Sequence, residues 1–533
     1  MGLFPLINVS FLLLSSIHPV NAATTPTNPV VDLGYARYQG VLDTKLSIAA
    51  FRGIRYGAPP TGSLRFQAPA VPPHVAGIQP AVEDPPQCYQ GAFGASPTNP
   101  FASRDEADPV QTEDCLFLSV YTPALNSTVP LPTVVWIHGG GFALGGASQY
   151  NGAELVQESD NKVVAVTINY RLGLFGFLAG QEVKDGGAVN AGLLDQEFAL
   201  KWVQKNIHRF GGDPSKVTIW GQSAGAGSVL QHIIAHNGRT NPPLFRAAIT
   251  SSAFLPSQYL YNHTIPQTLF NKVVEQAGCS GPTPLECLRG VDSASLANIN
   301  LNTILAGFQG TFSFVPVVDG SFITQSPTIA LARRKVNGHV LLAVTNTDEG
   351  SSFVNQGAEY NVTEYVRNLF PLIGEKESQE VAALYAPLGS PLEQVNEIMG
   401  DTIMKCPTYS LLNAFPTSSY KAAYAIPPAL HGQDVINYFP SITAFNAVLI
   451  YNNSAFINAF ADSFLSFAVN LNPNDKVRPS ITPVWKKWSP ASQSEMVFNK
   501  TELDAPAIAP DFTSSALLKR CEFWNSVRHL TAQ

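Results

Sequence analysis

The stretch Gly221-Gln222-Ser223-Ala224-Gly225 decides the fold of this 533-residue chain. Residues 216–220 before it are mostly apolar and predict a short buried strand, and residues 226–235 after it predict a helix. Ser223 therefore lies on a sharp strand-to-helix turn. Glycine is needed on both sides because neighbouring backbone leaves no room for a Cβ atom. The turn exposes the serine hydroxyl at a helix N-terminus, where a developing negative charge is favoured.

This turn has the context of a nucleophile elbow, and the strands around it predict an α/β fold. Apolar, β-branched runs are typical of strands buried on both faces of a sheet. Such runs occur at residues 116–121, 133–137, 162–168, 247–251 and 340–345. Their alternation with helical segments predicts a large, mostly parallel central sheet flanked by helices.

Helical patterns fill much of the remaining chain. Residues 190–206 have helical spacing, and residues 266–334 and 360–416 predict helical insertions around a pocket. Residues 420–426 predict a last strand, and residues 456–470 predict a closing helix.

A base and an acid must accompany the serine, because its hydroxyl is a weak nucleophile at neutral pH. In α/β hydrolases the acid and the histidine follow successive late strands. Two carboxylates, Asp348 and Glu349, follow the strand at 340–345, and either could orient a histidine. His431 follows the strand at 420–426 and is the predicted base.

Backbone N–H groups form the predicted oxyanion hole. Ala224 follows the nucleophile, and Gly140 and Gly141 lie in a glycine-rich loop directly after the strand at 133–137. Each such donor contributes about 3 to 4 kcal/mol in the transition state.

Two patterns that could indicate a cofactor or a metal fail on spacing. In the glycine-rich loop, the glycines that G-x-G-x-x-G requires fall on Leu144 or Phe142. His232 and His236 have the i, i+4 spacing of metal ligands, but no glutamate follows His232 as H-E-x-x-H requires. The sequence therefore predicts neither a cofactor nor a metal.

Composition argues against a nucleic-acid partner and for secretion. The formal net charge is -7, and the one basic run, at 333–335, is too short to neutralise many phosphates. Residues 1–22 predict a signal peptide and residues 23–533 a single domain, with no later stretch near the ~20 apolar residues of a membrane span. Six cysteines suit an oxidising compartment. Candidate glycosylation sites are Asn126, Asn262, Asn361, Asn452 and Asn499.

Taken together, these motifs resemble the type-B carboxylesterase and lipase family, which includes cholinesterases and fungal lipases. Residues 210–225 resemble its serine signature, and residues 113–118 resemble its second signature. Residues 169–173 and 192–196 also fall in family order. The resemblance covers essentially all of the mature chain, is that of a secreted fungal-type member, and implies an α/β-hydrolase fold and ester hydrolysis.

Carried over by position, the resemblance makes Ser223 the nucleophile, His431 the base and Glu349, rather than Asp348, the acid. It also implies that Ser251 supports that acid. Three disulfides follow from it as well, namely Cys88–Cys115, Cys279–Cys287 and Cys406–Cys521.

Differences between this sequence and two subtypes of the family narrow the expected substrate. Cholinesterases bind a quaternary ammonium group with a tryptophan in the first disulfide loop. No tryptophan lies between Cys88 and Cys115, so choline esters are not expected. This loop is also polar and broken by proline, unlike the amphipathic lid helix of fungal lipases. Gln222 stands where many members have glutamate, which removes a charge beside the nucleophile.

The sequence thus predicts a secreted serine carboxylesterase that hydrolyses a small-molecule ester through an acyl-enzyme. One alternative is a lipase or sterol esterase for long-chain esters. A second is a non-catalytic adhesion module, because some family members have lost the serine. The acyl and alcohol preferences and the oligomeric state stay open.

Overall fold

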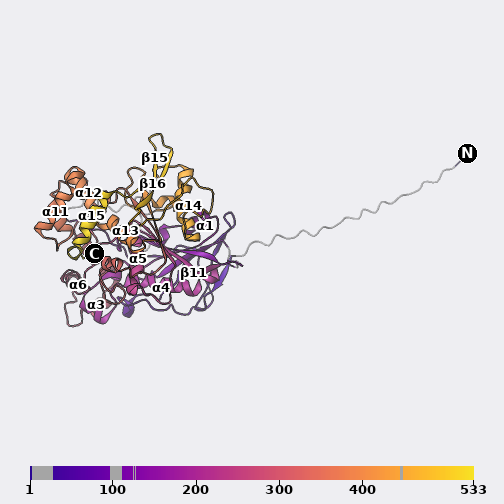
Figure 1. Cartoon of the computed structure of the whole chain (residues 1–533). Helices are drawn as coiled ribbons and strands as arrows, with labels where there is room; N and C mark the ends of the chain where they lie inside the picture. Colours follow the sequence, from indigo (N-terminus) through magenta and orange to yellow (C-terminus); the bar gives the residue numbers. More distant parts are fainter. Residues whose placement is uncertain (3–27, 97–110, 124, 126–127, 444–447) are drawn as a thin grey trace.

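The computed structural model describes residues 1–2, 28–96, 111–123, 125, 128–443 and 448–533. In this part of the chain, an eleven-stranded mixed sheet forms the centre and helices cover both of its faces (Figure 1). The predicted signal peptide lies outside the described residues from residue 3 onward. The predicted α/β architecture is present.

Eleven strands make up the central sheet. In spatial order they are β16 (Pro506–Phe512), β15 (Ser494–Lys500), β14 (Ser419–Tyr424), β13 (Val340–Asn346), β12 (Ala247–Ser251), β11 (Gly212–Gln222), β9 (Leu131–Ile137), β10 (Val164–Ile168), β8 (Phe117–Thr122), β4 (Ile48–Arg55) and β3 (Val41–Asp43). Two small sheets contain β1 (Val30–Asp32), β2 (Arg37–Gln39) and β5 (Ile78–Pro80), and β6 (Gln87–Cys88) and β7 (Gln111–Thr112).

The centre of the main sheet is parallel and its two ends are antiparallel. The run from β10 through β9, β11, β12, β13 and β14 to β15 is parallel throughout. Parallel strands covered on both faces read as continuous apolar runs, which is why the sequence located β9 to β13. Their carboxyl ends lie at one edge of the sheet, so the loops after them share that edge.

Sixteen α-helices are described. They are α1 (Gly152–Glu158), α2 (Gly173–Phe177), α3 (Gln181–Gly186), α4 (Ala191–Asn206), α5 (Ala224–Gly238), α6 (Thr264–Gln276), α7 (Pro284–Gly290), α8 (Ser293–Leu305), α9 (Pro327–Ala332), α10 (Val362–Leu369), α11 (Glu375–Tyr385), α12 (Pro391–Gly400), α13 (Cys406–Ala414), α14 (Ser454–Asn470), α15 (Ser515–Ser526) and α16 (Arg528–Thr531). A π-helical turn, Asp401–Lys405, joins α12 to α13.

The helices bury two separate apolar cores against the sheet. Helices α1 and α14 pack on one face, where the Trp220 ring of β11 stacks on Phe464 of α14 with 5.6 Å between ring centroids. Helices α4 and α5 and the insertion helices share the larger core on the other face. The predicted helical insertions appear as α6 to α9 and α10 to α13, and α6, α11 and α12 lie on the left side of Figure 1.

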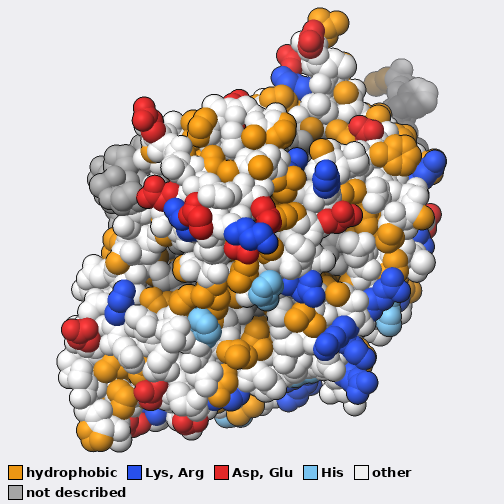
Figure 2. Space-filling view, turned by 60° about the vertical axis from the view of Figure 1, so that its left-hand side comes forward, with side chains coloured by type: hydrophobic (Ala, Val, Ile, Leu, Met, Phe, Trp, Pro, Cys, Tyr) orange, Lys and Arg blue, Asp and Glu red, His pale blue; other side chains and the backbone are white. Residues whose placement is uncertain are grey.

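Charged and apolar side chains are mixed over the described surface on that side. Figure 2 turns it forward and shows acidic and basic side chains interspersed with apolar ones. Within the described residues, no helix is long and apolar enough to cross a membrane.

One sequence prediction of the fold is wrong, because β14 is not the last strand. Two further strands, β15 and β16, extend the sheet beyond it, and α15 follows them. Pro506 and Pro510 lie in β16, and proline argues against a strand unless the strand is at an edge. β16 is that edge, where proline is tolerated.

The structure forms the three disulfides that the resemblance implies. Cys88–Cys115 closes the first loop, and Cys279–Cys287 links α7 to the segment before it. Cys406–Cys521 joins α13 to α15 across a sequence separation of 115 residues. The C-terminal helices are therefore fastened covalently to the second insertion.

Replacing both Cys406 and Cys521 by serine is expected to lower the free energy of unfolding by about 4 to 5 kcal/mol in the chain-entropy account of disulfides. The matched control replaces Cys279 and Cys287, which are 8 residues apart, and should cost about 2 to 3 kcal/mol. Denaturant unfolding of the three proteins measures both losses. Equal losses in the two variants would contradict the prediction.

Candidate active site

The turn that carries Ser223 is as crowded as the sequence suggests. β11 ends at Gln222 and α5 begins at Ala224, and Ser223 between them has φ 56° and ψ −124°. A Cβ atom on Gly221 would lie 2.4 Å from the backbone of Gly225, and one on Gly225 would lie 2.0 Å from the Ile137 carbonyl oxygen. Only glycine fits at both positions, and α5 starts two residues earlier than predicted.

Glu349 and His431 meet at the carboxyl edge of the sheet. Glu349 follows β13 and His431 follows β14, and both side chains are buried. His431 Nδ1 and Glu349 Oε2 are 2.6 Å apart. Asp348 turns away and accepts hydrogen bonds from the backbone and hydroxyl of Ser351. Of the two candidate acids, the structure brings Glu349 to the histidine.

Two donors hold the other oxygen of Glu349. The Ser252 hydroxyl and the Asn346 backbone N–H each donate to Oε1 over 2.7 Å. Burial by itself raises the pKa of Glu349, but the bond to His431 and its charge, with these two donors, hold that pKa below its usual range. Glu349 is therefore kept ionised in a buried position.

The resemblance assigned this support to Ser251, and that prediction is wrong. Ser251 is the last residue of β12, and its hydroxyl accepts a hydrogen bond from Trp220 Nε1 over 3.2 Å. Successive residues of a strand point to opposite faces, so Ser251 and the next residue cannot face the same group. Ser252, just past the strand end, reaches Glu349 instead.

A second buried acid, Asp434, lies next to this group, and sequence reasoning missed it. Asn346 Nδ2 donates to Ser252 Oγ over 3.2 Å and to Asp434 Oδ1 over 3.0 Å. The Tyr438 hydroxyl donates to Asp434 Oδ2 over 3.2 Å. Burial raises the pKa of Asp434 to about 6, and the charge of Glu349 adds to the effect. Its position three residues after His431 was the one available signal.

The glycine-rich loop after β9 brings its amides to the same place. Gly140 and Gly141 have φ +106° and +63°, and a Cβ atom on Gly140 would lie 2.2 Å from the Leu144 carbonyl oxygen. The Gly140 carbonyl accepts hydrogen bonds from the amides of Ala143 and Leu144. Among the residues that the structure describes, the backbone N–H groups of Gly140 and Gly141 donate to no acceptor. Ala224, as the first residue of α5, has no intrahelical acceptor either.

Several of these residues line one cavity of about 240 Å³. Ser223, His431, Gly140 and Gly141 all line it. Gln222 lines it as well, and its side-chain nitrogen lies 3.1 Å from His431 Nε2. Because His431 directs its Nδ1 hydrogen at Glu349, Nε2 carries the lone pair that this amide donates to.

A larger apolar cavity of about 420 Å³ lies behind this one. The two cavities share Phe312 and Phe353 as walls. Phe353 also contacts His431 edge to face, with 5.1 Å between ring centroids. An apolar cavity of about 150 Å³ holds one benzene molecule, so the larger cavity has room for considerably more apolar substrate.

The other motifs hold the framework of the site. Arg65 pairs with Glu113 over 2.6 and 2.7 Å, and Arg171 pairs with Asp195 over 2.7 Å in two bonds, all of them buried. Asn169 accepts a hydrogen bond from the Ala147 amide through its side chain. The motif residues Glu113, Asn169, Arg171 and Asp195 therefore support the framework and do not line the cavity.

The two histidines with metal-ligand spacing bind protein groups. His232 Nε2 contacts Gln196 Oε1 at 3.1 Å, and His236 Nε2 contacts Glu197 Oε1 at 2.7 Å. His236 has φ +53°, so the helix has already become irregular there. No group of three or more metal-ligating side chains gathers within the described ranges.

The glycosylation candidates differ in their surroundings. Asn262, Asn361 and Asn452 are exposed, and Asn499 is half-buried in β15. Asn126 lies outside the described residues, as do residues 97–110 of the first disulfide loop. Glycosylation and the absence of a lid helix stay predictions.

Asp434→Asn is expected to change the free energy of unfolding, relative to the wild type, more favourably at pH 7 than at pH 4. A carboxyl whose folded pKa of about 6 exceeds its unfolded value of 3.8 contributes stability below about pH 4 and loses it as the pH rises through 6. The asparagine variant escapes this loss of up to about 3 kcal/mol. Thermal unfolding of both proteins at several pH values measures the difference, and a difference independent of pH would contradict the assignment.

Comparisons with known proteins agree with this geometry. The model of the carboxylesterase family matches residues 27–524. The carboxylesterase patB of Aspergillus clavatus is 31% identical over 95% of this chain and 97% of its own. A secreted triacylglycerol lipase, LIP1 of Gibberella zeae, is 31% identical over 83% of this chain and 82% of its own. The crystal structure of Aspergillus niger EstA superimposes with a TM-score of 0.84 at 32% identity, over 95% of this chain and 99% of EstA. The chain belongs to the carboxylesterase family, and it is a carboxylic ester hydrolase with the α/β-hydrolase fold.

Proposed function

We propose that the protein is a secreted serine carboxylesterase that uses Ser223, His431 and Glu349 as a catalytic triad. One observation carries this proposal. Ser223 and His431 line a single cavity with Gly140 and Gly141, whose amides have no acceptor among the described residues, and Glu349 Oε2 contacts Nδ1 of the His431 ring.

Acylation begins with the transfer of the Ser223 proton to His431. Nε2 accepts it, and the serine oxygen attacks the ester carbonyl carbon. The ring becomes an imidazolium, and ionised Glu349, 2.6 Å from Nδ1, stabilises that charge and fixes the ring orientation. His431 then gives the proton to the leaving alcohol.

Negative charge develops on the carbonyl oxygen during this step. The amides of Gly140, Gly141 and Ala224 stabilise it because they are positioned before the reaction starts. Ala224 adds the positive end of the α5 dipole. A water molecule activated by His431 repeats the sequence on the acyl-enzyme and releases the acid.

The size of the catalytic cavity favours short acyl groups. Its volume is about 240 Å³, and Phe312 and Phe353 line both this cavity and the larger one. The second candidate, a lipase or sterol esterase for long-chain esters, is favoured by the apolar cavity of about 420 Å³ behind these rings. A long acyl chain reaches that cavity if the aromatic wall opens.

Secretion is part of the proposal. Residues 1–22 have the pattern of a signal peptide, and the three disulfides suit an oxidising compartment. The Gibberella zeae relative is a secreted lipase by name. We further propose that residues 23–533 act as one domain.

Ser223→Ala should lower kcat on a soluble p-nitrophenyl ester by roughly 10⁴- to 10⁶-fold, because the attacking oxygen is lost. The side chain removed is small, so the melting temperature should stay close to that of the wild type. Initial rates and labelling by an organophosphonate probe measure the loss. Turnover of wild-type size in the purified variant would sink the triad assignment.

Phe312→Ala should shift the acyl preference from short to long chains, because it opens the wall between the two cavities. We expect kcat/KM for p-nitrophenyl palmitate to rise at least tenfold relative to that for the acetate. Phe93→Ala is the matched control, because Phe93 lines the catalytic cavity but not the larger one. A chain-length profile that is unchanged in Phe312→Ala, or shifted equally in both variants, would argue against the wall.

A further inference from the structure

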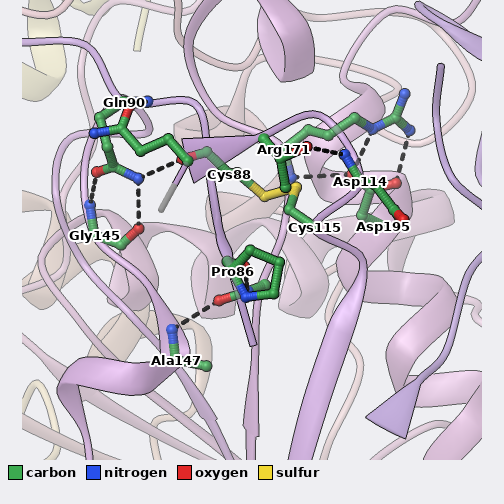
Figure 3. Close-up of a disulfide and its surroundings, with 12 residues drawn as sticks. Pro86, Cys88, Gln90, Asp114, Cys115, Gly145, Ala147, Arg171 and Asp195 are labelled. Atoms are coloured by element: carbon green, nitrogen blue, oxygen red, sulfur yellow. Dashed lines mark hydrogen bonds and ion pairs between the residues drawn. A yellow bond between two sulfur atoms is a disulfide. The ribbon is translucent and has the colours of Figure 1, made fainter. Parts of the chain in front are cut away.

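The side chain of Gln90 joins the first disulfide to the glycine-rich loop. Its Oε1 accepts a hydrogen bond from the Gly145 amide over 2.6 Å. Its Nε2 donates to the Gly145 carbonyl over 3.0 Å and to the Cys88 carbonyl over 2.7 Å (Figure 3). Both amide hydrogens and the amide oxygen of this one side chain are thereby used.

Gly145 ends the loop that carries Gly140 and Gly141. It has φ +97°, and a Cβ atom on it would lie 2.6 Å from His138 Nδ1. A loop this rich in glycine loses much conformational entropy on ordering, so contacts from outside must hold it. The paired bonds from Gln90 fix both the amide and the carbonyl of Gly145.

A second contact supports the same connection. The Gly91 amide donates to the Ala143 carbonyl over 2.7 Å, so residues 90 and 91 bind the loop at two neighbouring points. The Cys88–Cys115 bond, two residues before Gln90, anchors this segment. Gln90 itself lines the catalytic cavity.

We propose that Gln90 is a positioning residue that sets the place of the oxyanion-hole amides through Gly145. The proposal rests on the proposed function of Gly140 and Gly141. It requires no contact between Gln90 and substrate. Donors aimed at developing charge lose their effect when they move by a fraction of an ångström, whereas ground-state binding depends on them much less.

Two variants of Gln90 test the idea. Gln90→Met keeps the length of the side chain and removes all three hydrogen bonds. Gln90→Glu keeps an acceptor for the Gly145 amide but turns a carboxylate oxygen toward two carbonyls. We expect kcat on p-nitrophenyl butyrate to fall by about 10- to 100-fold in each, in the range of a weakened oxyanion donor, with KM within threefold of wild type.

Gln87→Met is the matched control. Gln87 lies in the same segment and is buried, whereas Gln90 is half-buried, and the Gln87 side chain donates to Ser148 Oγ and not to Gly145. Its kcat should stay within twofold of the wild-type value.

A second readout separates positioning from general loosening of the structure. An aryl trifluoromethyl ketone forms a tetrahedral adduct with the serine and places its oxyanion on the same amides. Its inhibition constant should weaken in proportion to kcat in both Gln90 variants. A ketone affinity that stays constant while kcat falls would overturn the proposal, as would wild-type kcat in Gln90→Met.

Failure of the function proposal would look different. In that case Ser223→Ala would keep its turnover, whatever the Gln90 variants do. If Ser223→Ala is inactive and both Gln90 variants keep wild-type kcat, the role of Gln90 alone is wrong. Equal losses of kcat in Gln90→Met and Gln87→Met would also overturn it.

Discussion

The close packing of the Ser223 turn against the end of β9 is the constraint on which the rest of the site depends. A Cβ atom on Gly225 would overlap the Ile137 carbonyl oxygen at 2.0 Å, and one on Gly139 would lie 2.6 Å from Gln222 Oε1. The Ser223 turn and the glycine-rich loop are therefore in direct contact. Ser223 has a left-handed backbone that costs about 1 to 3 kcal/mol, and the sheet around it maintains that strain.

A second constraint on the site is the set of buried charged groups around Glu349. Glu349 is fully buried, and the charges of two lysines, Lys405 and Lys421, interact with it. Lys421 comes from β14, and Lys405 from the π-helical turn before α13. The second insertion therefore places a cation, Lys405, near this buried carboxylate.

The sequence predicted most of the fold and the main groups of the site. Strands β9 to β13 were visible because burial on both faces leaves continuous apolar runs, and the elbow was visible because close approach demands glycine. The edge strand β16 was missed because Pro506 and Pro510 are tolerated only at an edge, and edge position is a property of the assembled sheet. Ser251 was predicted in place of Ser252 because the two are adjacent serines, and the point at which the strand ends decides which one faces Glu349.

Asp434 and Gln90 had no signal of comparable strength. Each acts through groups that are distant in the sequence, Asn346 in one case and Gly145 in the other. By itself the sequence predicted the candidate nucleophile, the order of the candidate acid and base, and the loop of candidate oxyanion donors, because local sterics and strand periodicity constrain neighbouring residues. The spacing left Asp348 and Glu349 open, and the tertiary structure brought Glu349, which the family resemblance favoured, to His431. Only the tertiary structure decided which serine supports this acid and how large the cavities are, because those depend on strand order and on where separate segments meet.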